Sequence, residues 1–261
     1  MDVDIILTES VGENASRYFD AAKKSKKKQA GARQAIERAR KELDKLQQQE
    51  QRFFEQEEQH RQQKPSRKKE WYEKFHWFMS SEGYLCVGGR DATSNDIIIK
   101  KHLEPDDLVL HTDMAGSPFF LIKNGKSAGQ ATIQEAAQAT AVYSKAWKLG
   151  HGTADVFYVK SEQVSKEAKS GEYLQKGSFM IYGKTTYIRP PMEMAIGVKE
   201  GTVIGGPVQA VQSQTKTYVT VIPGTFKKSE LAKKIKVKLK SGELDDIIAF
   251  LPAGEGEIKR E

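Results

Sequence analysis

A regular helical pattern of apolar and polar positions occupies the first quarter of the chain. Between Val11 and Lys64 there is no proline and there are only two glycines, Gly12 and Gly31; the segment is rich in alanine, lysine, glutamine, glutamate and arginine, which are strong helix formers. With Ile36 at heptad position a, ten of the thirteen a and d positions from Val11 to Phe53 are apolar, and four of these are alanine. The pattern predicts a coiled-coil arm over residues 1–70. Its helix would be about 75 Å long, and its narrow seam would need close contact with a second helix.

Beyond Pro65 the pattern changes to short apolar runs separated by turn residues. The runs 75–80 and 84–88 predict a hairpin that turns at Ser81-Glu82-Gly83. Further strands are expected at 108–111, 119–123, 155–160, 179–182 and 187–189.

Two helices are expected among these strands, at 94–102 and 132–149. Thr132 would cap the second, with Glu135 at the spacing of a capping box. Such irregular alternation favours an α+β fold for residues 71–198, with a mixed or antiparallel sheet and helices packed on one of its faces.

A small basic unit is expected over residues 199–261. Its pattern predicts two strands followed by two helices, at 207–212, 217–222, 229–240 and 244–250. In the first of these helices Leu231, Ile235 and Leu239 share one stripe, and lysines occupy most of the remaining surface.

The charge balance favours a polyanionic partner. The chain has 42 lysines and arginines against 35 acidic residues, for a net charge of +7 and a pI near 9.2. The basic excess lies in the two ends, because residues 71–198 are neutral by count. The single cysteine, Cys86, falls in an apolar strand and has no cysteine to pair with inside the chain, which favours a reducing, cytoplasmic compartment. No apolar run is long enough to span a membrane, and no cofactor is expected.

The turn G-G-R-D, Gly88 to Asp91, joins an expected strand to an expected helix. Neither a dinucleotide-binding fingerprint nor a P-loop is present. Arg90 could bind phosphate beside a helix N-terminus. Alternatively, the glycines permit a tight turn, Asp91 or Ser94 caps the helix, and Arg90 pairs with an aspartate.

The strand that follows ends in H-T-D, with His111 and Asp113 on the same face and Gly116 just beyond. Together with Asp91 these side chains could form a metal or acid–base site. A hydrogen-bonded structural pair, or a pair that lines an RNA groove, is the favoured interpretation, because no motif such as H-E-x-x-H is present. No catalytic residue and no metal site are therefore assigned.

Three other groups of residues have both a structural and a binding interpretation. Lys100, Lys101 and His102 would end a helix, where cations are favourable, and the two lysines could also reach phosphates. The lysines between Lys23 and Lys28 suit either a solvated helix face or a nucleic-acid backbone. The aromatic cluster from Trp71 to Phe78 could stack on bases but mainly indicates core packing.

The central motifs resemble the NFACT-R domain, the RNA-binding module of the NFACT ribosome quality control proteins. The resemblance rests on W-Y-E-K-F-H-W-F-M-S-S-E-G-Y-L-C-V-G-G-R-D-A-T-S-N-D, D-D-L-V-L-H-T-D-M-A-G-S-P, T-I-Q-E-A-A-Q-A-T-A-V-Y-S-K-A-W, Q-V-S-K and S-G-E-Y-L-Q-K-G-S-F-M-I-Y-G-K. It covers about residues 71–198. The segment V-D-I-I-L-T-E-S-V-G-E-N-A-S-R-Y-F is similar to the family's lead into its coiled-coil arm, and the C-terminal unit is similar to archaeal members. One departure is Ala115, where a second histidine is common in the family.

The resemblance implies a non-catalytic protein that binds the large ribosomal subunit and tRNA or rRNA during the rescue of stalled translation. The family's N-terminal NFACT-N half has no counterpart here, so the chain is expected to be a fragment, a split gene product or a shortened paralogue. A separate chain carrying that half, or a second copy of this chain, could pair with the arm. The RNA-facing surface is expected to include Arg90, Lys100, Lys101, His111, Lys123, Lys166 and Lys184. Of these, Arg90, His111, Lys166 and Lys184 lie in the matching motifs.

Two other functions remain open. The chain could be a general nucleic-acid-binding or protein-interaction module of the stand-alone NFACT-R type. It could also be a metal-dependent hydrolase that uses Asp91, His111 and Asp113.

Overall fold

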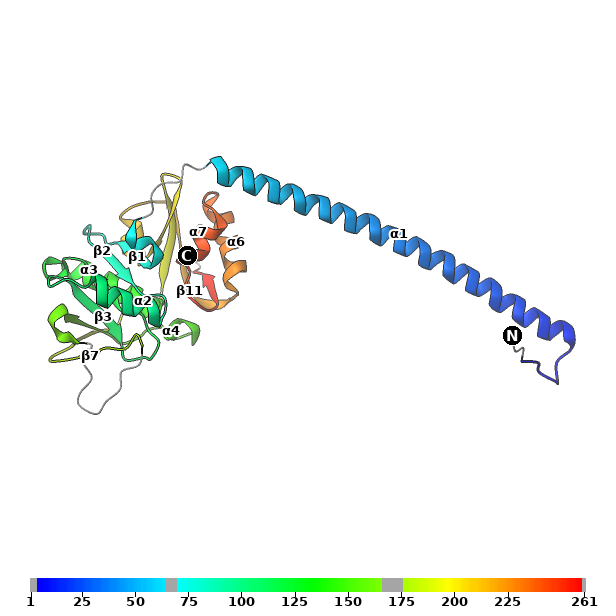
Figure 1. Ribbon diagram of the computed structural model, residues 1–261, viewed down its shortest axis with the longest axis horizontal. Helices are drawn as coiled ribbons and strands as arrows, with labels where there is room; N and C mark the ends of the chain where they lie inside the picture. Colours follow the sequence, from blue (N-terminus) through cyan, green and yellow to red (C-terminus); the bar gives the residue numbers. More distant parts are fainter. Residues whose placement is uncertain (1–3, 64–69, 166–175, 260–261) are drawn as a thin grey trace. The chain divides into compact units, whose positions relative to one another are not determined.

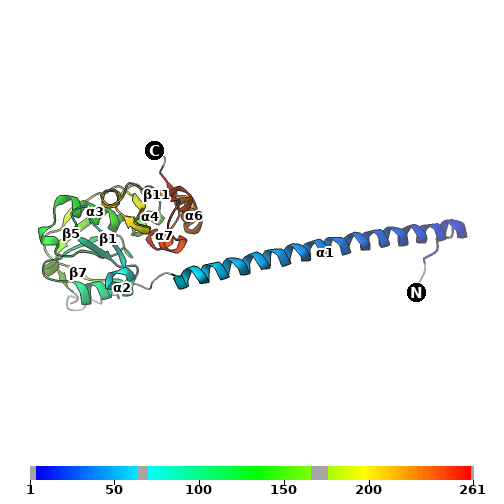
Figure 2. The ribbon, with the colours of Figure 1, turned by 90° about the horizontal axis from the view of Figure 1, so that it is seen from above.

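The chain divides into two units, residues 1–68 and 69–261. The computed structural model describes residues 4–63, 70–165 and 176–259, without the side chains of residues 44–63. Figures 1 and 2 show the elements of each unit from two directions.

The first unit is a long helix, α1 (Val11–Gln63), which confirms the helical part of the predicted arm. Ser10 and Glu13 cap its start, since the Ser10 amide donates to the Glu13 carboxylate (2.8 Å) and the Glu13 amide donates to Ser10 Oγ (3.3 Å). Asn14 is buried and bonds to Ile6 main-chain atoms, which folds residues 4–9 back onto the helix.

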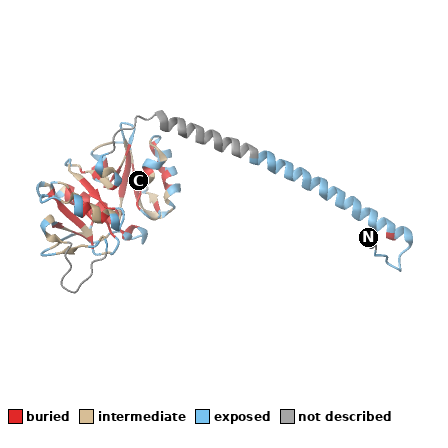
Figure 3. Cartoon of the chain, in the orientation of Figure 1, coloured by how far each residue is buried: buried red, intermediate tan, exposed pale blue. Residues whose placement is uncertain are grey.

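The expected coiled-coil seam is exposed where its side chains are described. Ile36 and Leu43, at two seam positions, are 55% and 56% exposed. Figure 3 shows the described part of α1 in the exposed colour almost throughout. The pairing of this seam with a second helix stays a prediction.

The second unit contains all the described strands and the remaining helices. Its strands are β1 (His76–Met79), β2 (Leu85–Gly88), β3 (Leu108–Thr112), β4 (Phe120–Ile122), β5 (Val156–Lys160), β6 (Val164–Ser165), β7 (Met180–Ile181), β8 (Thr186–Ile188), β9 (Met194–Lys199), β10 (Thr202–Gly206), β11 (Tyr218–Phe226) and β12 (Gly256–Ile258). Its α-helices are α2 (Ala92–Ile97), α3 (Gln130–Val142), α4 (Lys145–Lys148), α5 (Val208–Gln212), α6 (Lys228–Leu239) and α7 (Leu244–Phe250). A π-helical turn, η2 (Ile98–His102), continues α2, and three short 3₁₀ turns complete the set: η1 (Trp71–Lys74), η3 (Gly125–Ser127) and η4 (Ser161–Gln163).

The main sheet has six antiparallel strands in the order β1-β2-β4-β3-β5-β8. The predicted hairpin is present as β1 and β2. Because side chains alternate along a strand, neighbouring residues such as Val109 and Leu110 enter different core clusters on the two faces. The α+β fold class with an antiparallel sheet is thus confirmed.

Helices cover both faces of this sheet rather than the one face expected. Helix α3 packs against β3, β4 and β5 on one face. On the other face Ile98 and Ile99 of η2 join the cluster formed by Val87, Val109 and Leu121. The short helix at 92–102 has too few turns to show its buried side in the sequence.

The start of α3 corrects the predicted cap. Its N-cap is Gly129, and Thr132 lies inside the first turn. The Thr132 amide and hydroxyl bond to the carboxylate of Glu82, at the tip of the β1–β2 hairpin, and Glu135 is buried. The helix also ends earlier than predicted, because Ser144 caps a separate turn, α4, through its contact with the Ala146 amide (3.2 Å).

A second antiparallel sheet follows, in the order β10-β9-β11-β12. The run predicted as a strand at 207–212 is the helix α5, whose Ala210 and Val211 are buried. The hairpin there is β9–β10, whose turn residues Glu200 and Gly201 have φ angles of 50° and 78°, as in a type I′ turn. The expected boundary between residues 198 and 199 lies inside β9, and the division of this unit into two domains stays a prediction.

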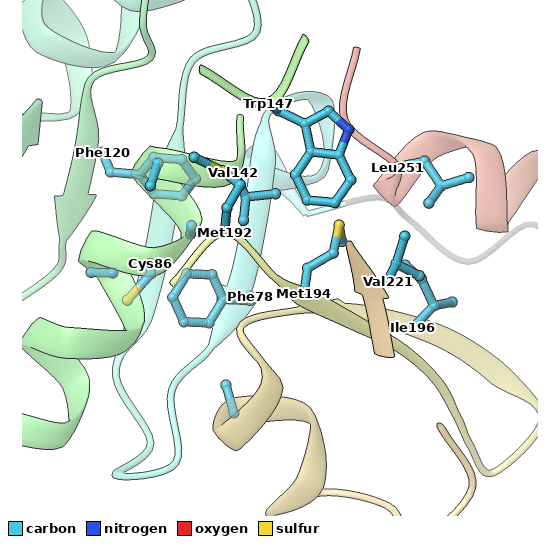
Figure 4. Packing of buried hydrophobic residues seen from close by; sticks show 14 of the residues in the cluster. Phe78, Cys86, Phe120, Val142, Trp147, Met192, Met194, Ile196, Val221 and Leu251 are labelled. Atoms are coloured by element: carbon cyan, nitrogen blue, oxygen red, sulfur yellow. The ribbon is translucent and has the colours of Figure 1, made fainter. Parts of the chain in front are cut away.

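The two sheets share one hydrophobic core. Phe78 and Phe120 of the first sheet belong to the same buried cluster as Met194, Ile196 and Val221 of the second. Figure 4 shows these side chains converging, with Trp147 and Leu251 beside them. Cys86 is buried in the same cluster, as its apolar setting predicted. Within the described ranges, no helix is both long and apolar enough to cross a membrane.

Candidate nucleic-acid interface

The two glycines of the G-G-R-D turn are required by close packing. A Cβ atom at Gly88 would overlap the ring of Phe120, and one at Gly89 would overlap the side chain of Asn95. Gly88 is the last residue of β2, and Gly89 donates its amide to the Phe119 carbonyl (3.1 Å). The glycines thus bring β2 and α2 together at the end of β4.

Asp91 and Ser94 cap the helix that follows. The Ser94 amide donates to the Asp91 carboxylate (2.7 Å), and Ser94 Oγ accepts the amides of Arg90 (2.7 Å) and Asp91 (2.8 Å). The Ser94 amide and the Ser94 hydroxyl, which both donate to the Asp91 carboxylate, hold the pKa of Asp91 below its usual range. The start of α2 is therefore occupied by the protein's own groups, which favours the structural interpretation of this turn over a phosphate cradle.

Arg90 pairs with none of the aspartates whose side chains the structure describes. One of its terminal amino groups donates to the carbonyl of Phe75 (3.1 Å), while the residue as a whole is exposed. A guanidinium has five N–H donors, so this bond positions Arg90 and leaves most of its donors available to a ligand.

Asn95 connects the turn to the end of β3, and the sequence pattern did not single it out. Its side chain is buried, donates to the Ser117 carbonyl (3.1 Å) and accepts the Phe119 amide (3.0 Å). Gly116 has a φ of +82°, a conformation that favours glycine, so the 112–118 turn can close onto Asn95.

His111 and Asp113 lie at this same end of the sheet and have partners within the fold. His111 Nε2 lies 3.2 Å from the Ser117 carbonyl, and the ring stacks on Phe119 with centroids 4.1 Å apart. Burial lowers the pKa of His111, so the ring is neutral near pH 7 and donates through Nε2. Asp113 accepts a hydrogen bond from the Tyr187 hydroxyl (3.1 Å).

These segments enclose a cavity of about 470 Å³. It brings together the G-G-R-D turn, the H-T-D strand end and the turn at residues 176–179, which are far apart in the chain. Phe119, Phe157 and Phe179 line its apolar part, with Phe119 and Phe179 in edge-to-face contact at 5.3 Å. Arg90 and Lys176 are the basic residues of its lining.

Lys176 is held beside Arg90 by the glycine that follows it. The Gly177 amide donates to the Asp96 carboxylate (3.1 Å), and Gly177, at φ +80°, packs directly against the backbone of Ala92. Lys176 was not among the cations expected from the sequence. The sequence feature that could have indicated Lys176 is its position directly before a glycine, Gly177, in the turn that leads into the short strand β7.

Two of the predicted cations lie elsewhere. Lys101 and Lys123 line a second cavity, of about 560 Å³, at the Leu85 end of β2, opposite the glycine turn. Lys123 has a side chain only 13% exposed, and its ammonium group bonds to the Asp107 carboxylate (2.6 Å) and the His102 carbonyl (2.7 Å). Its contacts therefore give Lys123 a structural role.

The other predicted cations are scattered. Lys100 pairs with Asp96 on α2, and Lys184 is exposed in the turn between β7 and β8. Lys166 lies outside the described residues. The structure thus places Arg90 and His111 in one cavity and does not bring the whole predicted set together.

The aromatic cluster is mainly structural. Phe75 and Phe78 are buried, whereas Trp71 is 37% exposed and stacks on His102 with centroids 4.1 Å apart in the second cavity. Lys23 to Lys28 are exposed along α1, which leaves both interpretations of that run open.

The hydrolase hypothesis has little support in this geometry. Asp91 caps a helix, His111 contacts a carbonyl and Asp113 contacts a tyrosine hydroxyl. Nowhere in the described part of the chain do three or more histidine, cysteine or acidic side chains come together as metal ligands would.

Comparisons with known proteins agree with the motif resemblance. The RNA-binding domain of NFACT proteins matches residues 74–183. The archaeal Rqc2 homolog aRqcH of Methanocaldococcus jannaschii is 39% identical over 203 residues, which cover 75% of this chain and 30% of that protein. Human ribosome quality control complex subunit NEMF is 40% identical over 70% of this chain and 17% of its own length. The Drosophila melanogaster NEMF homolog is 35% identical over 75% of this chain and 20% of its own length.

A solved structure, the C-terminal part of the fibronectin/fibrinogen-binding protein of Streptococcus suis, matches 49% of each chain at 18% identity and a TM-score of 0.39. The chain spans less than a third of the length of the three curated relatives above. The described cavity lies in the matched segment, since its lining runs from Gly89 to Ile181. The chain belongs to the NFACT family, and residues 74–183 are its RNA-binding domain.

Proposed function

We propose that this chain binds RNA at the cavity between the G-G-R-D turn, the H-T-D strand end and the Lys176 turn. In this proposal it acts without catalysis in cytoplasmic ribosome-associated quality control, on the large ribosomal subunit and its tRNA. The observation that carries the proposal is the convergence of Arg90 and Lys176 over an aromatic-lined cavity inside the segment that matches the NFACT RNA-binding domain.

The chemistry of the cavity suits single-stranded or looped RNA. A guanidinium can bind a phosphate with two parallel hydrogen bonds, and an ammonium group adds a second point charge. Phe179 is partly exposed and provides apolar surface on which an unstacked base can rest, whereas Phe119 and Phe157 are buried behind it in the core. The two aspartates of the lining are engaged by Ser94 and Tyr187, so each already has a hydrogen-bond partner.

The same geometry favours binding over hydrolysis. A general base needs a side chain free to accept a proton from the attacking group. His111 donates to the Ser117 carbonyl, and Asp91 is committed to the start of α2. We therefore assign these residues to the shape of the cavity.

The proposal is tested with Arg90→Gln and Lys176→Gln. Each should weaken binding of tRNA and co-sedimentation with split large ribosomal subunits by about fivefold to tenfold at 0.1 M salt, since each removes one phosphate contact. Arg90→Lys should give an intermediate loss, because the charge is kept and the fork is lost.

Lys126→Gln is the matched control. Lys126 pairs with Asp106 on the surface near the start of β3, whereas the cavity lies at the other end of that strand. Binding unchanged by both cavity substitutions, or reduced equally by the control, would argue against this site. Equal affinity for duplex DNA and tRNA would favour a general nucleic-acid-binding module instead.

A further inference from the structure

Helix α6 (Lys228–Leu239) displays a cationic surface that lies outside the segment matched by the RNA-binding domain. Its apolar side is buried against the second sheet through Leu231, Ile235 and Leu239, as the sequence pattern predicted. The opposite side is formed mainly by lysines, and Lys233, Lys236 and Lys238 are all exposed. A helix packed on the sheet thus presents these charges along one exposed side.

The lysines of α6 have few partners of their own. The helix contains five lysines and a single acid, Glu230, and Lys227 and Lys240 flank it. Lys234 lies 3.8 Å from Glu230 and 3.9 Å above the ring of Phe226. Among the residues that the structure describes, no ion pair is formed by Lys233, Lys236, Lys238 or Lys240.

This arrangement carries an energetic cost. Like charges three or four positions apart destabilise a helix by about 0.2–0.5 kcal/mol per pair, and Lys233 and Lys236 or Lys234 and Lys238 are such pairs. Lys227 and Lys228 also stand at the helix N-terminus, where the dipole disfavours cations. A face selected only for solubility would gain stability by alternating lysine with glutamate. The uniform charge therefore favours an anionic partner.

The start of α6 lies close to the proposed RNA cavity. Tyr143 lines that cavity, and its hydroxyl donates a hydrogen bond to the carbonyl of Phe250 (2.6 Å). Phe250 is the last residue of α7, and the helix α7 packs against α6. Burial lowers the pKa of Lys228, and the nearby charge of Arg90 lowers it further. Arg90 also bonds to the carbonyl that precedes His76 (3.1 Å), and the His76 ring stacks on Tyr143 with centroids 3.8 Å apart. These contacts connect Arg90 with the pair α6 and α7, so we expect that one strand of nucleic acid can reach both.

We infer that the exposed lysines of α6 contact the phosphate backbone of RNA that extends beyond the cavity. This inference rests on the proposed function and adds a second surface to it. Ammonium groups act as point charges and do not read bases, so contact along α6 should be independent of sequence and strongly dependent on salt.

RNA length separates the two surfaces. The test uses the full chain with two single-stranded RNA probes, one of about six nucleotides, within the range of one compact site, and one of about thirty. Lys233→Gln/Lys236→Gln should weaken binding of the long probe about tenfold at 0.1 M salt and make its log–log salt slope shallower by about 1.4, because two phosphate contacts are lost. Binding of the short probe should not change. Glutamine is a good helix former, so the circular dichroism of the variant should match that of the wild type.

Lys126→Gln/Lys160→Gln is the control of equal charge. Both lysines form exposed ion pairs, with Asp106 and Glu162, which contribute little to stability. If the α6 variant binds the long probe as the wild type does, or loses no more affinity than this control, the α6 surface is excluded. If the wild type binds neither probe, the proposed function itself is wrong.

Discussion

Gly88 and Gly89 show how a single missing atom positions the site. The ring of Phe120 and the side chain of Asn95 occupy the space that a Cβ atom would need at these two residues. This packing lets β2 run directly into the turn that carries Arg90. The close approach of these two side chains to the glycine backbone, rather than phosphate binding, explains both glycines.

Replacing Gly88 with alanine should destabilise the fold by about 1–3 kcal/mol, because the new methyl group overlaps a buried aromatic ring. Chemical denaturation of the full chain measures the change. Gly152→Ala is the control, since no atom lies within 4 Å of its Cβ position, and it should leave the free energy of unfolding within about 0.5 kcal/mol of the wild type. Equal stability of the two variants would contradict this role of Gly88.

His76 makes stability depend on pH. Its ring stacks on Tyr143 with centroids 3.8 Å apart. Burial, together with the charges of Arg90 and Lys228, lowers its pKa to about 3, against 6.5 for a free histidine. The unfolded chain therefore binds more protons at this residue between pH 3 and 6.5. The free energy of unfolding is therefore not reduced by His76 above pH 6.5, and it decreases as pH falls from 6.5 toward 3 because the unfolded chain binds a proton that the folded chain does not.

The substitution His76→Phe should remove this dependence while keeping the stack. Between pH 7 and pH 5 the wild type should lose about 2 kcal/mol more stability than the variant, as measured by denaturation at each pH. Parallel profiles for wild type and His76→Phe would show that His76 does not titrate in this way.

At the scale of elements, the hairpin β1–β2 and the helix α3 are joined by a carboxylate. Glu82 accepts the Thr132 amide (3.0 Å) and the Thr132 hydroxyl, so a hairpin residue satisfies the first turn of a helix fifty positions away. These bonds hold the pKa of Glu82 below its usual range.

Glu82→Gln should lower the melting temperature at pH 7, because it removes a charged acceptor at the α3 N-terminus. A lowered pKa in the folded state means that the contribution exists above the ordinary glutamate pKa and is lost as pH falls through the lower folded value. The difference in melting temperature from the wild type should therefore shrink in acid. Glu162→Gln, which removes an exposed ion pair of 3.8 Å, should cause little change at either pH. A melting temperature of Glu82→Gln that equals that of this control at pH 7 would disprove the cap.

Local pattern was a good guide to elements whose apolar residues repeat regularly. The arm is a helix, β1 and β2 form a hairpin, and Leu231, Ile235 and Leu239 are buried along one side of α6, as predicted. The pattern failed where distant partners decide. Thr132 resembled a cap because its actual partner, Glu82, lies fifty positions earlier in the chain and cannot be inferred from the local sequence. Residues 207–212 resembled a strand, although Val208 and Val211 are also spaced to lie on one side of a helical turn.

At the scale of the whole molecule, the candidate site depends on three segments that only the fold brings together. The motifs G-G-R-D and H-T-D indicated two of the segments that line the cavity. Lys176 was missed, and Lys123 was selected, because a sequence does not show which lysine meets a buried carboxylate such as Asp107. The same limit applies to α6, whose lysines were visible as a pattern but whose connection to the cavity through Tyr143 and α7 was not.

The two units contribute separately to this picture. All residues of both buried clusters lie in the second unit, and the described seam of α1 is exposed. We propose that the seam binds a second helix, either from another copy or from a separate chain, while the second unit binds RNA.

Ultraviolet cross-linking of the full chain to RNA, followed by mass spectrometry, is the most direct test of RNA binding at this cavity. We expect cross-links at Phe179, which is partly exposed and lines the cavity together with Arg90 and Lys176. Cross-links confined to the second cavity, around Trp71 and Tyr84, or to α1, with none in the peptide that contains Phe179, would contradict the proposal.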